Sequence, residues 1–431
     1  MRKKIKAVLK SDMIKVSSKN GAATAFRLAS GFVVSKVLAI FVGPSGLAIL
    51  GQMSNITNIF QTISTGGITI GITKYIAEYA DDKIRQQKII LNALVITFIC
   101  SAFCSAFILI FYKYINRVIF AKQNYESIVL ILGATILVFS FNSVIAAVLN
   151  GLKNFKLYIR INIISSVLTL ISTLTLVYFF HLYGALLSLI AVPSALFFIS
   201  WYLVRNEPWA TKDFFFKRPD LKILKLFGKF SLMAINNAVV GAVAQIVVRN
   251  FLTKNMSLDV AGIWDGMNRL SSAYLILLTT SIQIYYLPAL SYIKDRKLLW
   301  REIMKTEKII LPLALIGFLL IYFFRGVIID ILFSPKFYLM KSVIGLQLIG
   351  DLIKVGSWIM AYTFYAKAMT KQLILTDNIF TTTYVIIAYL FLMHTNLGLH
   401  AVYVAYIINN VIACSTNFYI MKRYTSNTNY E

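Results

Sequence analysis

Long apolar runs, separated by short polar and basic stretches, recur along the whole chain. Many of these runs reach 20 residues, the length that an α-helix needs to cross the hydrocarbon core of a bilayer. The pattern therefore predicts an all-α polytopic membrane protein with about twelve transmembrane helices. Their approximate ranges are 20–42, 45–73, 87–112, 125–149, 156–180, 183–204, 228–252, 261–290, 303–324, 338–366, 371–393 and 398–421.

Composition supports this prediction. Hydrophobic residues occupy 58% of the 431 positions, charged residues occupy only 14%, and the mean hydropathy is +0.74. Soluble domains carry about 25% charged residues, so a soluble fold is excluded. The first apolar run contains Arg27 and Lys36 and lacks a small-residue cleavage site. We therefore interpret it as a membrane span and not as a cleaved signal peptide.

Basic residues are distributed unevenly between the two sides of the predicted membrane. If the N-terminus is cytoplasmic, the tails and loops on that side hold 31 of the 43 Lys and Arg residues, and the outer loops hold 7. The positive-inside rule then predicts that both termini are cytoplasmic. The formal net charge of +26 is explained by topology and contact with anionic lipid, so it is not a sign of nucleic-acid binding.

Weak internal similarity divides the chain into two halves. The segment "NGLKNFKLY" from residue 150 falls opposite "AKAMTKQLI" from residue 366, a spacing of about 216 residues that other pairs of segments share. An even number of spans per half predicts two six-helix bundles of the same orientation, with a substrate site between them. The predicted domains are a basic N-terminus (1–19), an N-terminal bundle (20–205), an amphipathic cytoplasmic linker (206–227), a C-terminal bundle (228–421) and a cytoplasmic tail (422–431).

Charged residues inside the spans are the candidate functional groups, because each costs at least ~2.5–3.5 kcal/mol in hydrocarbon. Asp265 and Arg269 are four residues apart, and Asp351 and Lys354 are three apart. Both spacings place the two side chains on one helix face, so local pairing is predicted. We expect the two aspartates to act in gating or ion coupling.

Three intramembrane cations are left over once those pairs are formed, namely Arg27, Lys36 and Arg249. A surplus of cations favours an anionic ligand such as a diphosphate headgroup, which arginine and lysine bind well. The alternatives are anchoring near helix ends and packing between helices. The predicted substrate-binding residues are Arg27, Lys36, Arg249, Arg269 and Lys354, and the predicted polar cavity lining includes Asn55, Thr62 and Gln283.

Several function classes lack their sequence signatures. The chain has no Walker A sequence, no HExxH, no CxxC pair and no Gly-rich nucleotide loop, so we expect no catalytic residues, no metal and no cofactor. The predicted outer loops are short, which argues against a polyprenyl-dependent glycosyltransferase or polymerase. A multidrug exporter would be expected to show uncompensated carboxylates, and a structural scaffold would have little reason to keep buried charges.

Short segments spread over nearly the whole chain resemble the Wzx-type flippases of the multidrug/oligosaccharidyl-lipid/polysaccharide exporter superfamily. They are "GPSGLAILGQ" (43–52), "GITKYIAEYADD" (71–82), "AGIWDG" (261–266), "YLPALS" (286–291), "LQLIGDLIKVGSW" (346–358) and "YAKA" (365–368). The similarity is greatest to the O-antigen and enterobacterial common antigen (lipid III) flippases.

The resemblance implies a MATE-like fold in the bacterial inner membrane. It also implies transport of an undecaprenyl-diphosphate-linked oligosaccharide to the periplasmic leaflet, with an O-antigen polymerase and a chain-length regulator as partners. By the same similarity, Lys36, Arg249, Asp351 and Lys354 fall at charged positions of the family pattern, and Arg27 falls at a basic one. Asp265 and Arg269 do not clearly match that pattern.

Overall fold

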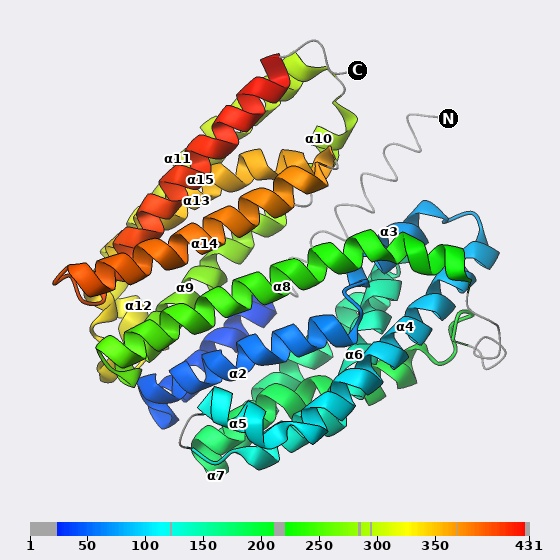
Figure 1. The fold of residues 1–431 in the computed structure, drawn as a ribbon, viewed down its shortest axis with the longest axis horizontal. Coiled ribbons are helices and arrows are strands. Elements are labelled where there is room, and N and C mark those ends of the chain that lie inside the picture. The colour runs from blue at the N-terminus through cyan, green and yellow to red at the C-terminus, as the bar shows by residue number, and fades with distance from the viewer. Residues whose placement is uncertain are drawn as a thin grey trace. The chain divides into compact units, whose positions relative to one another are not determined.

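The chain is helical throughout the part that the structure describes (Figure 1). This computed structural model describes residues 24–120, 123–210, 220–282, 286–293, 295–367 and 369–426. Among them, nine helices are long and apolar enough to cross a membrane. One of these, α7 (Phe155–Val204), contains two of the predicted spans, because His181 interrupts it with a φ of 48°. The all-α prediction is therefore confirmed.

The chain divides into two compact units. The first comprises Met1–Val42 and Gln52–Val239, and the second comprises Gly43–Gly51 and Val240–Glu431. The division falls inside α8, and the bundle and linker boundaries drawn from the sequence stay a prediction. The first unit contains the helix Thr24–Phe41 and most of α2 (Gly43–Ser64), followed by α3 (Thr69–Glu78), α4 (Lys83–Ile110), α5 (Tyr112–Phe120), α6 (Glu126–Gly151), α7 and the start of α8 (Leu221–Asn255).

Short polar residues mark several helix starts. The side chains of Asp82, Asn154, Ser257 and Asp295 each accept a hydrogen bond from the backbone N–H three residues later. Each bond satisfies one of the N–H groups that a helix start leaves without an intrahelical partner. Polar residues in apolar sequence therefore set helix boundaries as well as lining sites.

One predicted span is wrong. The sequence predicted a continuous helix over 45–73, but α2 ends at Ser64 and α3 begins at Thr69. Gly66 and Gly67 lie between them with φ values of 64° and 65°, a left-handed conformation that glycine adopts without strain. The apolar run continues through this turn, so hydropathy alone gave no sign of the break.

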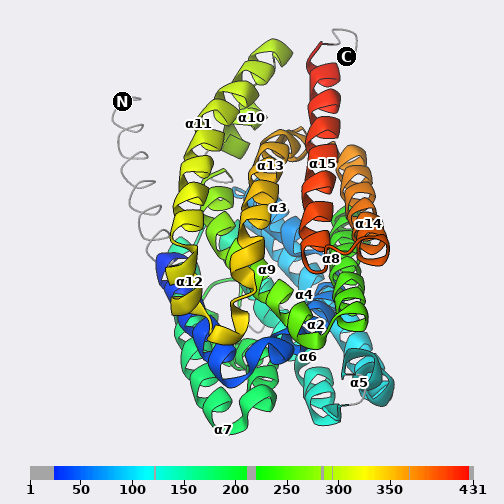
Figure 2. The same ribbon diagram turned by 90° about the vertical axis from the view of Figure 1, so that its left-hand side faces the viewer.

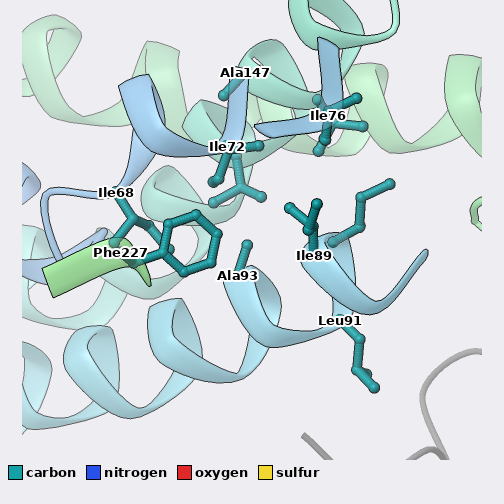
Figure 3. Packing of buried hydrophobic residues seen from close by; sticks show 11 residues of the cluster. Ile68, Ile72, Ile76, Ile89, Leu91, Ala93, Ala147 and Phe227 are labelled. Atoms are coloured by element: carbon teal, nitrogen blue, oxygen red, sulfur yellow. The ribbon is translucent and has the colours of Figure 1, made fainter. Parts of the chain in front are cut away.

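The core of the first unit includes a cluster of aliphatic side chains from α3, α4 and α6, together with Phe227 of α8 (Figure 3). Ile72 and Ile76 project from α3 toward Ile89 and Ala93 of α4, and all four are fully buried or nearly so. These helices also pack pairwise along their lengths, with α4 beside α6. The unit is thus held by close packing of large aliphatic residues.

The second unit repeats the element order of the first. Its elements are α9 (Leu258–Ser281), α10 (Leu287–Tyr292), α11 (Arg296–Phe323), α12 (Arg325–Leu332), η3 (Pro335–Phe337), α13 (Met340–Ala366), α14 (Thr370–His394) and α15 (His400–Ser426). The starts of α11 and α12 lie 213 residues after those of α4 and α5, and the start of α13 lies 214 after that of α6. This near-constant offset supports the internal duplication. Figure 2 shows α13 between α11 and α15, and it packs against both.

Candidate functional site

A cavity of about 790 Å³ lies within the second unit. Its described lining comes from the C-terminal part of α8 and from α9, α13, α14 and α15. The volume is within the range of small-molecule and headgroup sites, which is roughly 300–1,000 Å³. We treat this cavity as the candidate site. All of its described lining residues belong to the second unit.

The lining is aromatic and polar, with little charge. Nine of its described residues are aromatic, namely Trp264, Trp358, Tyr362, Phe364, Tyr365, Phe380, Tyr384, Tyr403 and Tyr406. Six more carry side-chain amides and six carry Ser or Thr hydroxyls, namely Gln245, Asn268, Gln347, Asn409, Asn410, Asn417, Ser271, Ser272, Thr279, Ser357, Thr376 and Thr381. Among the described lining residues, Lys354 and Asp377 carry charge, and no salt bridge joins them.

Asp351 lies behind this wall and is fully buried. Its Oδ2 accepts hydrogen bonds from Ser271 (2.7 Å), Tyr274 (2.5 Å) and Gln347 (3.0 Å), and its Oδ1 accepts one from Tyr406 (2.7 Å). Four donors from α9, α13 and α15 thus surround one carboxylate. Hydrogen bonds to a charged acceptor are roughly twice as strong as neutral ones, so Asp351 ties the three helices together.

Lys354 does not form the predicted ion pair with Asp351. No salt bridge within 4.0 Å joins them in the described part of the chain. The Lys354 ammonium lies instead 4.9 Å from the ring centroid of Trp358 and 5.4 Å from that of Tyr406. The predicted local pair is wrong because Asp351 finds its partners on neighbouring helices, while Lys354 is stabilised by two aromatic faces.

Asp265 is paired with a different residue from the one predicted. Its carboxylate accepts two hydrogen bonds from Arg249, 2.6 Å from Nε and 2.7 Å from Nη2, and both side chains are almost fully buried. The predicted i,i+4 pair with Arg269 is therefore wrong. The guanidinium of Arg249 on α8 donates to both carboxylate oxygens of Asp265, a two-bond geometry that arginine and carboxylate groups favour. The Arg249 guanidinium also lies 5.7 Å from the ring of Trp264, which lines the cavity.

The start of α2 packs closely against the Arg249–Asp265 pair. A Cβ atom added to Gly51 would come within 2.7 Å of Arg249 Nη2 and 2.8 Å of Asp265 Oδ2. At Gly262 a Cβ would collide with the backbone carbonyl of Pro44. Glycine at both positions lets the segment Gly43–Gly51 lie directly against α9, and the backbone N–H of Ser45 donates to Asp259 Oδ1 (3.1 Å).

A family model described as "Polysaccharide biosynthesis protein" matches residues 22–294. The chain belongs to this family. It is also 26% identical to proteins named lipid III flippase from Escherichia coli (strain K12) and Shigella flexneri, over 95% of this chain and 99% of each relative. Among solved structures, a multidrug resistance MATE family transporter of the MOP superfamily matches with a TM-score of 0.76 at 18% identity, over 94% of each chain. A MOP superfamily transporter from Pyrococcus furiosus matches with a TM-score of 0.63 at 16% identity, over 94% of this chain and 95% of that one. The predicted MATE-like fold is confirmed.

Four more of the site residues predicted for this member of the polysaccharide biosynthesis protein family, Arg27, Lys36, Asn55 and Thr62, belong to the first unit. Arg27 is exposed on the helix Thr24–Phe41, and Lys36 is half-buried on the same helix. Asn55 is buried, and its Nδ2 has no hydrogen-bond partner. The hydroxyl of Thr62 donates to the carbonyl of Asn58 within its own helix. Gln283 lies outside the described residues.

The wall formed by α14 and α15 was not predicted from the sequence. On α15, Tyr403, Tyr406, Asn410 and Asn417 all line the cavity. Their spacings of three, four and seven residues place them on one helix face. This polar stripe inside an apolar span was a usable sequence signal, although none of its residues is ionised. The one charged residue of α14 on the wall, Asp377, was also missed.

Proposed function

We propose that this chain is a flippase for a lipid-linked oligosaccharide. It would move an undecaprenyl-diphosphate-linked glycan from the cytoplasmic to the periplasmic leaflet of the bacterial inner membrane by alternating access, without making or breaking a bond. Three findings support the proposal: the family to which the chain belongs, relatives named lipid III flippase that match over nearly their full length, and a fold shared with transporters.

The observation that carries the proposal is the chemistry of the cavity. Amide and hydroxyl side chains bind sugar hydroxyl groups, and aromatic rings supply broad faces with polar tips at Tyr and Trp. A site for hydrophobic cations would instead be expected to expose excess negative charge. In the described lining, one lysine is matched by one aspartate, so no such excess is present.

The proposal extends to location and partners. A flippase of this kind would work beside an O-antigen polymerase and a chain-length regulator in the same membrane. The cytoplasmic placement of both termini remains a prediction from the distribution of Lys and Arg.

Rescue of glycan display tests the function. The chain is expressed in a bacterium that lacks its own flippases and makes a defined undecaprenyl-diphosphate-linked glycan, and a panel of such glycans is supplied in turn. We expect surface glycan to return with at least one of them, and cytoplasmic-leaflet lipid-linked glycan to fall. Failure with every glycan, together with increased drug resistance in a pump-deficient host, would favour a multidrug exporter of the same fold.

A further inference from the structure

Three acceptor groups of the described cavity wall have no hydrogen-bond partner within the chain. Asp377 is an exposed residue that lines the cavity, and the described part of the chain gives its carboxylate no hydrogen bond and no salt bridge. Asn409 Oδ1 and Asn417 Oδ1 are buried and have no hydrogen-bond partner. A buried polar atom without a partner costs roughly 1–3 kcal/mol, so a ligand that supplies donors here gains from relieving that cost.

The side-chain amide of Asn417 has its oxygen, and not its nitrogen, left without a partner. Its Nδ2 donates to the hydroxyl of Ser357 (2.9 Å), which leaves Oδ1 unsatisfied. The hydroxyl of Tyr403, one turn and a half before Asn409, is likewise buried without a partner. The four groups, which include the carboxylate of Asp377, come from α14 and α15.

The cation of the described wall, Lys354, is stabilised by aromatic rings. Lys354 lies over the rings of Trp358 and Tyr406, and the only other charge of the described lining is the opposite charge of Asp377. A diphosphate offers acceptors only and carries negative charge. It would bring acceptors toward the acceptors of α14 and α15 and an anion toward Asp377, so these two helices do not match it. In the described lining, Lys354 of α13 is the only cation that would offset this mismatch.

Sugar rings match the same wall. Their hydroxyl groups, and the N–H of an acetamido group, are donors for Asp377 and for the amide oxygens of Asn409 and Asn417. The positively polarised C–H face of a pyranose suits the negative face of an aromatic ring, and Trp264 and Trp358 both line the cavity.

We propose that this cavity of the second unit is the sugar subsite of the transported glycan, that Asp377 is its specificity-determining acceptor, and that the diphosphate is held outside the cavity. The proposal rests on the proposed function, and it reverses the sequence-based assignment of Lys354 to the diphosphate.

The substitution Asp377→Asn separates the two ligand chemistries by sign. In a sugar subsite it removes a charged acceptor, which weakens sugar binding by roughly tenfold or more. In a diphosphate site the same change removes a like charge and therefore strengthens binding. Glu302→Gln is the matched control, because it also removes one carboxylate charge. Glu302 lies on α11, its carboxylate is 4.0 Å from the Lys305 ammonium, and it is not among the described lining residues of the cavity.

Binding is measured on the full chain purified in lipid nanodiscs, with the change in tryptophan fluorescence as the readout. The probes are the oligosaccharide released by mild acid from a lipid-linked glycan that the wild-type chain exports, and inorganic pyrophosphate. We expect the oligosaccharide to bind wild type and Glu302→Gln equally and Asp377→Asn at least about tenfold more weakly. We expect pyrophosphate not to compete.

The outcomes distinguish the two proposals. If the wild-type chain exports no lipid-linked glycan in the rescue strain, the proposed function fails and the subsite fails with it. If the wild-type chain exports the glycan but Asp377→Asn binds the oligosaccharide as tightly as wild type, only the subsite is overturned. Competition by pyrophosphate that becomes stronger in Asp377→Asn also overturns the subsite and returns the cavity to the diphosphate. A melting curve for each variant confirms that it is folded.

Discussion

The buried pair between Arg249 and Asp265 provides the sharpest test of the structure. The two side chains are only 3% and 7% exposed, and two hydrogen bonds of 2.6 and 2.7 Å join them. Removing one partner of such a pair leaves a buried charge without compensation, which costs roughly 3–5 kcal/mol. Replacing both partners by apolar residues of similar volume is often neutral or stabilising.

The single variants Arg249→Met and Asp265→Leu should therefore be strongly destabilised, and the double variant should recover most of the loss. For a unit of about 200 residues, 1 kcal/mol shifts the melting temperature by roughly 2–4 °C, so each single variant should melt about 6–20 °C below wild type. The double variant should melt within about 5 °C of wild type, because neither charge is left alone.

Melting is followed by intrinsic tryptophan fluorescence of the detergent-purified chain, with monodispersity checked by gel filtration. Arg269→Met is the matched control, since the sequence had assigned Asp265 to Arg269. If Arg269→Met is as destabilising as Arg249→Met, or if the double variant melts at the sum of the two single losses, the pairing is refuted.

Three further predictions use the same melting assay. Asp351→Leu should destabilise the chain far more than Asp351→Asn, because leucine leaves four donors, two buried and two half-buried, without an acceptor, at roughly 1–3 kcal/mol for each buried one, whereas asparagine keeps one carbonyl oxygen. Equal losses would contradict the four-donor arrangement. Gly262→Ala should lower the melting temperature, since its Cβ would collide with the carbonyl of Pro44, while Gly317→Ala, with open space around it, should not; equal effects would refute the close approach. His181→Gly should raise the melting temperature, because a non-glycine residue at φ 48° stores roughly 1–3 kcal/mol of strain. A decrease would show that the contacts of the His181 side chain stabilise the chain by more than this strain.

Hydropathy predicted the helical framework because membrane helices must satisfy their backbone hydrogen bonds internally, which requires long apolar segments. The internal duplication was also visible, and the starts of α11 to α13 repeat those of α4 to α6 at a nearly constant offset. The break at Gly66 and Gly67 was not predicted, since a left-handed glycine pair changes the direction of the chain without changing its polarity.

Side-chain pairing was predicted less well than the helices. Spacing within one helix shows which residues share a face, but it does not show which residues of other helices that face meets. Asp265 therefore pairs with Arg249 of α8, and Asp351 with donors from α9, α13 and α15. The polar face of α15 could have been found from spacing alone, whereas Asp377 became significant only when the cavity placed it on a wall.

Four intramembrane charges of the second unit, those of Arg249, Asp265, Asp351 and Lys354, find partners within the chain without a phosphate ligand. Arg249 and Asp265 neutralise each other, four donors satisfy Asp351, and two rings accommodate Lys354. These charged residues also contact side chains that line the cavity. Arg249 lies over the ring of Trp264. Asp351 accepts a hydrogen bond from the hydroxyl of Tyr406, and the ring of Tyr406 faces Lys354. A sugar is bound by many weak contacts, and these are effective only when the rings and amides are held in position before the ligand arrives. The intramembrane charges would then serve recognition indirectly, by holding the rings and amides of the wall in position around a cavity whose own described lining is balanced in charge.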